Sequence, residues 1–278
     1  MQSQNDRREG NSVIKGKGFY DNYFKNEHYV SYKYDVGSFC TRRFIRDRIK
    51  SKSGRLLEIG TGLYPILFEL PQFESFGIDI SASTIKKNKR LAEQEGINAS
   101  FIVTNVEDGL PFPANYFDVI VSAHTLEHIK DDYTVLQECV RVLKPGGEII
   151  FFVPGNLKGK ASEEEWKKLG HYRNYNSKRF REMERFLASQ LFIEEILFPH
   201  KIHNLIWNRL KHFFRYANYF IRKFIKKDNY SFEHRVLYQK RFLPAISCCL
   251  DHLDYLFMKN ELLLSRLPYN VFVCFRKK

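Results

Sequence analysis

The sequence lacks the features that direct a chain into or across a membrane. No apolar run approaches the roughly 20 residues of a membrane-spanning helix, although hydrophobic residues make up 44% of the 278 residues. The N-terminal segment, 1–18, is polar and has no apolar core of a signal peptide. We therefore expect a cytoplasmic protein with a sizeable buried core and a polar, mobile tail over 1–18.

Cysteines are few, and their spacing is uninformative. The chain has five, an odd number, with no C-x-x-C pair: Cys40, Cys139, Cys248, Cys249 and Cys274. This pattern argues against a disulfide framework and against a zinc site. We expect a reducing compartment and no metal-binding residues.

Strand and helix patterns alternate through the middle of the chain. Short apolar runs predict seven strands, at 55–60, 75–81, 99–105, 116–124, 147–155, 190–200 and 269–277. Helical patterns lie between them at 81–96, 131–147 and 177–192, with Ser81 and Ser177 as expected N-caps. This alternation predicts an α/β fold with a doubly wound, seven-stranded, mostly parallel sheet and helices on both faces.

The stretch "RLLEIGTGLYP" (55–65) resembles half of a dinucleotide-binding fingerprint. Gly60 and Gly62 have the G-x-G spacing, but Pro65 stands where the third glycine would be. Glu58 before the loop would repel phosphates and suit an amino group. Asp79 ends the next strand, where an acid binds ribose hydroxyls. An adenosine with a cationic amino-acid tail and no phosphate fits, which points to S-adenosylmethionine.

Further stretches resemble the class I, Rossmann-like S-adenosylmethionine-dependent methyltransferases. "NVEDGLPFPANYFDVIVSAHTLEHI" (105–129) is similar to the third- and fourth-strand region of that family, and "RVLKPGGEIIFFVP" (141–154) resembles its turn into the fifth strand. The resemblance covers roughly residues 54–156 in four ordered motifs.

The resemblance implies roles for individual residues of the cofactor site. Asp79 would hold the ribose hydroxyls, and Asn105, where the family commonly has Asp, would meet the adenine edge. The full implied set is Glu58, Gly60 and Gly62 at the methionine end, Asp79 at the ribose, Ile80, Asn105 and Val106 at adenine, and Ser122 and Ala123 along the methionine moiety. Asp79 has an alternative role as a helix cap, although Ser81 is better placed for it.

The acceptor side is marked by "HYRNY" (171–175), whose H-x-R-x-Y spacing resembles a segment of bacterial small-molecule and glycan methyltransferases. His171 is the candidate general base, because an alcohol or ammonium acceptor must lose a proton. Arg173 and Tyr172 are candidates for acceptor binding, Arg173 for an anionic group. The alternative is that these residues only hold the loop by hydrogen bonds. His124 is a second candidate for the catalytic base, and Glu127 with His128 is expected to anchor a turn.

The two ends of the chain extend the core. We expect a helical cap over 19–53, a methyltransferase core over 54–200, a helical insertion over 201–268 as an acceptor lid, and the last strand over 269–278. In 203–227, an apolar helical stripe faces seven Arg and Lys residues, and no acid occurs between Glu195 and Asp228. This segment predicts either a lid or a surface that contacts anionic membranes.

These observations favour a methyltransferase that acts at oxygen or nitrogen of a small molecule or glycan. The net charge of +13 also fits nucleic acid. An RNA methyltransferase is therefore the first alternative, although no RNA-binding module is recognisable. A cofactor-binding but non-catalytic partner protein is the second. The sequence does not predict the oligomeric state.

Overall fold

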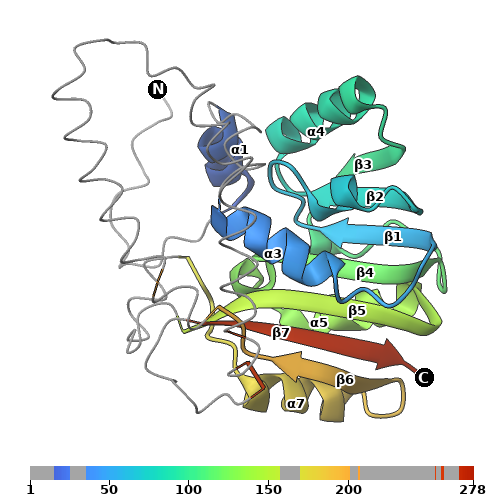
Figure 1. Ribbon diagram of the computed structural model, residues 1–278, viewed down its shortest axis with the longest axis vertical. Coiled ribbons are helices and arrows are strands. Elements are labelled where there is room, and N and C mark those ends of the chain that lie inside the picture. The colour runs from blue at the N-terminus through green and yellow to red at the C-terminus, as the bar shows by residue number, and fades with distance from the viewer. Residues whose placement is uncertain are drawn as a thin grey trace, which may run out of the picture.

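The computed structural model describes residues 16–25, 36–156, 170–200, 206, 254, 258–259 and 269–278. Its centre is a seven-stranded sheet with the order β3-β2-β1-β4-β5-β7-β6 (Figure 1). Only β7 is antiparallel to its neighbours. The strands are β1 (Gly54–Ile59), β2 (Phe73–Asp79), β3 (Ala99–Val103), β4 (Phe117–Ala123), β5 (Leu143–Asn156), β6 (Leu191–Leu197) and β7 (Tyr269–Lys277). The expected mostly parallel sheet is confirmed.

The central strands are buried on both faces, as their continuous apolar runs predict. Ile59 at the end of β1 pairs with Ile78 of β2 on one side and with Ser122 of β4 on the other. The carboxyl ends of these three strands therefore meet at one edge of the sheet. In parallel sheets this is the edge at which ligands bind.

Helices cover both faces of the sheet. Phe44 of α3 and Leu91 of α4 belong to the apolar cluster on one face, whereas Val135 of α5 and Phe180 of α7 belong to the cluster on the other. Figure 1 shows α3 in front of the sheet and α5 behind it. The α-helices are α1 (Lys17–Lys25), α3 (Val36–Arg46), α4 (Ala82–Glu95), α5 (Asp132–Val142) and α7 (Ser177–Phe186).

The ends of α4 follow the sequence signals. Ser81 is the N-cap, and its hydroxyl accepts a hydrogen bond of 3.2 Å from the Thr84 N–H. Gly96 is the C-cap in the left-handed conformation, with φ of 65°, which glycine adopts at no steric cost. The prediction of a helix between these two residues is confirmed, and Ser81, not Asp79, caps it.

Two predicted helix ends were wrong. The helix expected over 131–147 ends at Val142, because Leu143 already pairs with Phe117 as the first residue of β5. The helix expected from Ser177 to residue 192 ends at Phe186, and its N-cap is Asn176, whose side-chain oxygen accepts from the Arg179 N–H at 2.9 Å. A strand pairing distant in sequence therefore sets the end of α5, and a local side-chain cap sets the start of α7.

The N-terminal region forms two helices of the described chain, α1 and α3, and α1 begins at Lys17. Most of the predicted tail over 1–18 and nearly all of the predicted insertion over 201–268 lie outside the described residues. Within the part of the chain that the structure describes, no helix has the length and apolar character needed to cross a membrane.

Candidate active site

A cavity of about 620 Å³ opens at the carboxyl edge of β1, β2 and β4. Tyr20 of α1 and Arg42 of α3 line it from one side, and Tyr172 lines it from the segment that precedes α7. The predicted cofactor residues that line it are Glu58, Gly60, Gly62, Asp79, Ile80, Asn105, Val106 and Ala123. The structure therefore brings this set together around one cavity.

The loop after β1 needs glycine for two separate reasons. Gly60 has φ of 73°, and a Cβ atom there would lie 2.0 Å from the Thr125 hydroxyl oxygen. Gly62 has φ of 50°, and an added Cβ atom would meet nothing within 4 Å. Gly60 is thus required by close packing as well as by backbone conformation, whereas Gly62 is required by conformation alone.

Glu58 and Pro65 together explain why a third glycine is absent. Pro65 is the N-cap of a short 3-10 helix, η1 (Ile66–Glu69). The carboxylate of Glu58 accepts hydrogen bonds from the N–H groups of Ile66 at 3.0 Å and Leu67 at 2.9 Å. Burial raises the pKa of Glu58 to about 8, although these two hydrogen bonds oppose the shift. Glu58 therefore orders the chain after the loop as well as lining the cavity.

Asp79 fixes the loop from the neighbouring strand. Its two oxygens accept from the Gly62 N–H at 3.0 Å and from the Ser81 N–H at 2.9 Å. Burial raises the pKa of this carboxyl group, whereas the backbone hydrogen bonds act in the opposite direction. A carboxylate offers about four acceptor sites, so Asp79 can still accept from a ligand hydroxyl.

Asn105 and Ser122 have structural contacts that the sequence did not indicate. The Asn105 side-chain oxygen accepts from the Glu107 N–H at 3.2 Å and caps the 3-10 helix η2 (Val106–Asp108). The Ser122 hydroxyl donates to the Ile59 carbonyl at 3.0 Å and is buried. Asn105 lines the cavity, whereas Ser122 is absent from its described lining.

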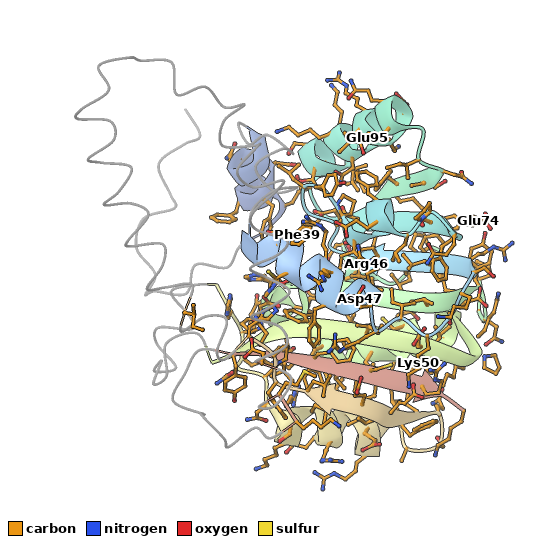
Figure 2. The ribbon with its side chains drawn as sticks, in the orientation of Figure 1. Phe39, Arg46, Asp47, Lys50, Glu74 and Glu95 are labelled. Carbon is orange, nitrogen blue, oxygen red and sulfur yellow. The ribbon has the colours of Figure 1, made fainter. Side chains whose placement is uncertain are left out.

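Arg42 is a cavity residue that sequence reasoning missed. It is only 4% exposed, its Nε atom donates to Glu69 at 2.8 Å, and its guanidinium lies 4.9 Å from the centre of the Tyr64 ring. Arg46, one turn further along α3 (Figure 2), also binds Glu69, at 3.3 Å. Arg42 brings a buried positive charge to the same cavity as Glu58. In the sequence it is one of many arginines, and no motif distinguishes it.

His124 follows β4 in a conformation that is unusual for histidine. Its φ is 54°, its N–H donates to the Phe152 carbonyl at 2.8 Å, and its Nδ1 atom lies 3.7 Å from Glu127 Oε1. The side chain is 45% exposed and lines the cavity. The left-handed conformation costs energy, and here it turns the imidazole toward the cavity.

The H-x-R-x-Y segment is held against the turn after β4. The Tyr172 N–H donates to the Glu127 carbonyl at 2.8 Å, and Arg173 binds Asp132 at 3.0 Å and the Ile129 carbonyl at 3.0 Å. The Tyr175 hydroxyl also binds Asp132, at 2.8 Å. Arg173 is absent from the described cavity lining. The structure places it in this scaffold, so the loop-holding alternative fits it better than acceptor binding.

His171 is buried beside the predicted turn residues. It is 9% exposed, and its ring centre lies 4.8 Å from that of His128 at an angle of 77°. His128 and Glu127 belong to the 3-10 helix η3 (Leu126–His128). His128 Nδ1 lies 2.9 Å from the Gly170 carbonyl, a contact that joins the turn to the segment. Unlike His124, His171 is not part of the described cavity lining.

Comparison with known families finds a similarity to methyltransferases in the middle of this chain. Residues 57–151 match the family described as "Methyltransferase domain". Among curated relatives, a ubiquinone biosynthesis O-methyltransferase of Coxiella burnetii is 30% identical over 111 residues, which are 39% of this chain and 47% of that protein. A ubiquinone/menaquinone biosynthesis C-methyltransferase of a Shewanella species is 32% identical over 139 residues, covering 44% and 55%. The chain spans about half the length of these relatives.

Solved structures share the fold at low sequence identity. Phosphoethanolamine N-methyltransferase 2 of Haemonchus contortus, in complex with S-adenosyl-L-methionine, matches with a TM-score of 0.60 and 17% identity over 93% of this chain and 60% of its own. A putative sarcosine dimethylglycine methyltransferase of Galdieria sulphuraria matches with a TM-score of 0.56 and 16% identity over 86% and 82%. Residues 57–151 are therefore similar to a methyltransferase domain, and the chain shares the fold of these methyltransferase structures.

Proposed function

We propose that this chain transfers a methyl group from S-adenosylmethionine to an oxygen or nitrogen atom of a small-molecule or glycan acceptor. The observation that carries the proposal is the pair of acids at adjacent strand ends. Glu58 and Asp79 line one cavity with the Gly60–Gly62 loop between them, and Pro65 replaces the glycine that a pyrophosphate-binding loop uses. When bound, S-adenosylmethionine supplies a methyl group on a positively charged sulfur.

The cavity residues suit the three parts of this cofactor. Asp79 has acceptor capacity for the ribose hydroxyls, and Ile80, Asn105 and Val106, which line the same cavity, are the residues proposed to contact the adenine ring. Glu58 suits the ammonium group of the amino-acid end. Arg42, the buried cation of the same cavity, suits its carboxylate.

Methyl transfer requires residues that position the acceptor and a base that removes its proton. An acceptor lone pair forms a bond to the methyl carbon while the carbon–sulfur bond breaks, and that electron pair stays on sulfur to give S-adenosylhomocysteine. The acceptor proton leaves to a base in the same step or before it. His124 is the histidine best placed as the base, because its exposed imidazole lines the cavity.

The relatives support a small-molecule acceptor over the two alternatives. Their names denote quinone-biosynthesis methyltransferases, and structural neighbours include an amine methyltransferase. RNA methylation and a non-catalytic role remain as outcomes of the test. A cytoplasmic location and a contact of 203–227 with anionic membranes also remain proposals, and that segment lies outside the described residues except for Ile206.

The test is a turnover assay with the full chain and methyl-labelled S-adenosylmethionine. Phenols, amines, glycans and RNA are offered as acceptors, and S-adenosylhomocysteine is measured in parallel with transferred label. Label in a phenol, amine or glycan is the expected result. Label only in RNA favours the first alternative, and cofactor binding without turnover on any acceptor favours the second.

A variant pair assigns the base. His124→Ala should lower kcat by about 10²–10⁴-fold and leave cofactor affinity unchanged. Glu74→Ala, at an exposed position at the far end of β2 where Glu74 binds Arg55 at 2.9 Å (Figure 2), is the matched control and should keep the wild-type rate. A wild-type rate for His124→Ala would exclude His124 as the base.

A further inference from the structure

Three metal-ligating side chains converge beside the cavity. Glu127 and His128 come from η3, and His171 comes from the segment before α7. One donor atom from each lies within 4.8 Å of the other two. Residues far apart in the chain are thus brought together by the contacts that hold the H-x-R-x-Y segment.

His128 is oriented as metal-binding histidines are. Its Nδ1 atom lies 2.9 Å from the Gly170 carbonyl, which can only accept a hydrogen bond, so the proton of the neutral ring is on Nδ1. The lone pair of Nε2 then points away from that carbonyl, and Nε2 lies 4.0 Å from Glu127 Oε1. A hydrogen bond from the second nitrogen of a ligand histidine to a carbonyl is the usual supporting contact in metal sites.

Glu127 has a buried acceptor atom that the described part of the chain leaves unsatisfied. The side chain is 2% exposed, and its Oε2 atom has no hydrogen-bond donor among the residues that the structure describes. A buried carboxylate oxygen without a partner is costly. A cation between the three side chains would supply the missing partner.

A second cluster of possible metal ligands differs from the first, because protein groups already occupy its acceptor atoms. Glu148, Glu194 and Cys274 also place donor atoms within 4.8 Å of one another. There, however, Glu148 accepts from the Lys50 and Ser51 N–H groups at 3.0 and 2.9 Å, and Arg276 binds Glu194 at 2.6 Å. Protein cations and backbone donors already neutralise that cluster, which leaves no role for a metal ion.

We propose that Glu127, His128 and His171 bind a divalent first-row transition ion of the Zn²⁺ type. Two imidazoles and one carboxylate form a donor set that such ions bind with a further position open. Since Zn–N and Zn–O bonds are about 2.0–2.2 Å long, the three donors close by side-chain rotation on binding. His128 and Tyr172 line the cavity, so an ion held by these side chains would lie beside it. There the ion binds and polarises an oxygen of the acceptor, a role that rests on the proposed methyl transfer.

The binding test needs neither cofactor nor acceptor, which separates it from the test of methyl transfer. The full chain is stripped with a chelator and titrated with Zn²⁺ in a calorimeter. We expect one ion per chain, and His171→Ala and Glu127→Gln should each weaken binding by more than about tenfold. Glu194→Gln, in the second cluster, is the matched control and should bind like wild type. Absence of one-to-one binding by the wild-type chain overturns the proposal.

The location and the role of the metal ion are both tested with the wild-type chain, so these conclusions do not depend on how the variants fold. An anomalous difference map from crystals soaked in Zn²⁺ should show a peak between the three side chains, and a peak elsewhere overturns the site. For the role, chelation should abolish turnover and leave S-adenosylmethionine binding unchanged. Full turnover by the metal-free chain, in the proposed methylation assay, overturns the contact with the acceptor.

Discussion

The carboxylate of Asp21 on α1 accepts a hydrogen bond of 2.7 Å from the hydroxyl of Ser81, the residue that caps α4. The Ser83 N–H donates to the same Asp21 oxygen at 3.1 Å. Ser81 in turn donates its N–H to Asp79. Asp21 therefore joins α1 to the start of α4, which lies beside it (Figure 1), and so to the residue proposed to hold the ribose. The neighbouring Tyr20 lines the cavity.

Asp21→Ala should weaken cofactor binding without unfolding the core. The substitution releases α1 from α4, so Tyr20 no longer closes the cavity. We expect lower affinity for S-adenosylhomocysteine by calorimetry and faster proteolytic cleavage near α1, with the main thermal transition unchanged. Hydrogen bonds from Ser81 and Ser83 lower the pKa of Asp21. Asp21 is therefore ionised at neutral pH and accepts both hydrogen bonds. Their stabilisation is lost only as pH falls through the lowered pKa of Asp21. Unaltered affinity would show that α1 does not contribute to binding.

Asp79→Ala should weaken the binding of S-adenosylmethionine by roughly 2–3 kcal/mol, the scale for losing a charged hydrogen-bond acceptor. NAD should not bind to either protein, since the loop lacks the third glycine. Asp79→Asn keeps the shape of the side chain and one acceptor oxygen, so its loss of affinity for S-adenosylmethionine should be smaller. Calorimetry with both ligands makes the measurement. Tight NAD binding, or equal affinity of the alanine variant and wild type, contradicts the proposed ribose contact.

Most of the fold was predictable because its signals are local. The apolar runs of β1 and β4 are nearly continuous, as in strands buried on both faces, and Ser81 and Gly96 mark the ends of α4. The end of α5 was not predictable. Leu143 continues the apolar face of the helix, but it is recruited into β5 by pairing with Phe117, a contact that no local pattern encodes.

The site was predictable only where residues follow strand ends. Asp79 and the Gly60–Gly62 loop were found because strand order brings them to one edge. Arg42 was missed because its partner, Glu69, lies 27 residues away in η1. The role of Arg173 was uncertain in the sequence for the same reason: its partner Asp132 lies on α5, and only the fold brings the two together.

Asp132→Ala should destabilise the protein by roughly 3 kcal/mol, measured by denaturant unfolding. Asp132 is 1% exposed and binds Arg173 at 3.0 Å, Arg179 at 2.6 Å and the Tyr175 hydroxyl at 2.8 Å. Its removal leaves two partly exposed guanidinium groups and a buried hydroxyl without their shared partner. Glu182→Ala is the control, because Glu182 binds Arg179 at 4.0 Å on the surface and should cost less than about 1 kcal/mol. Equal losses for the two variants would contradict a central role for Asp132.

Glu58→Gln should change how stability depends on pH. The pKa of Glu58 is raised from 4.5 to about 8, mainly by burial, so the folded state favours the protonated form. Glu58 contributes its full stabilisation at pH values below its pKa in the unfolded state. This contribution is lost as pH rises through its pKa in the folded state. The amide that the substitution introduces does not titrate. It can satisfy only one of the Ile66 and Leu67 N–H groups, which costs about 1 kcal/mol. The free energy of unfolding of the variant should therefore be lower than that of wild type near pH 4.5. As pH rises to about 8, the wild-type value should fall relative to that of the variant. Unfolding free energies across this range make the test, and parallel curves for the two proteins would show that Glu58 is ionised throughout.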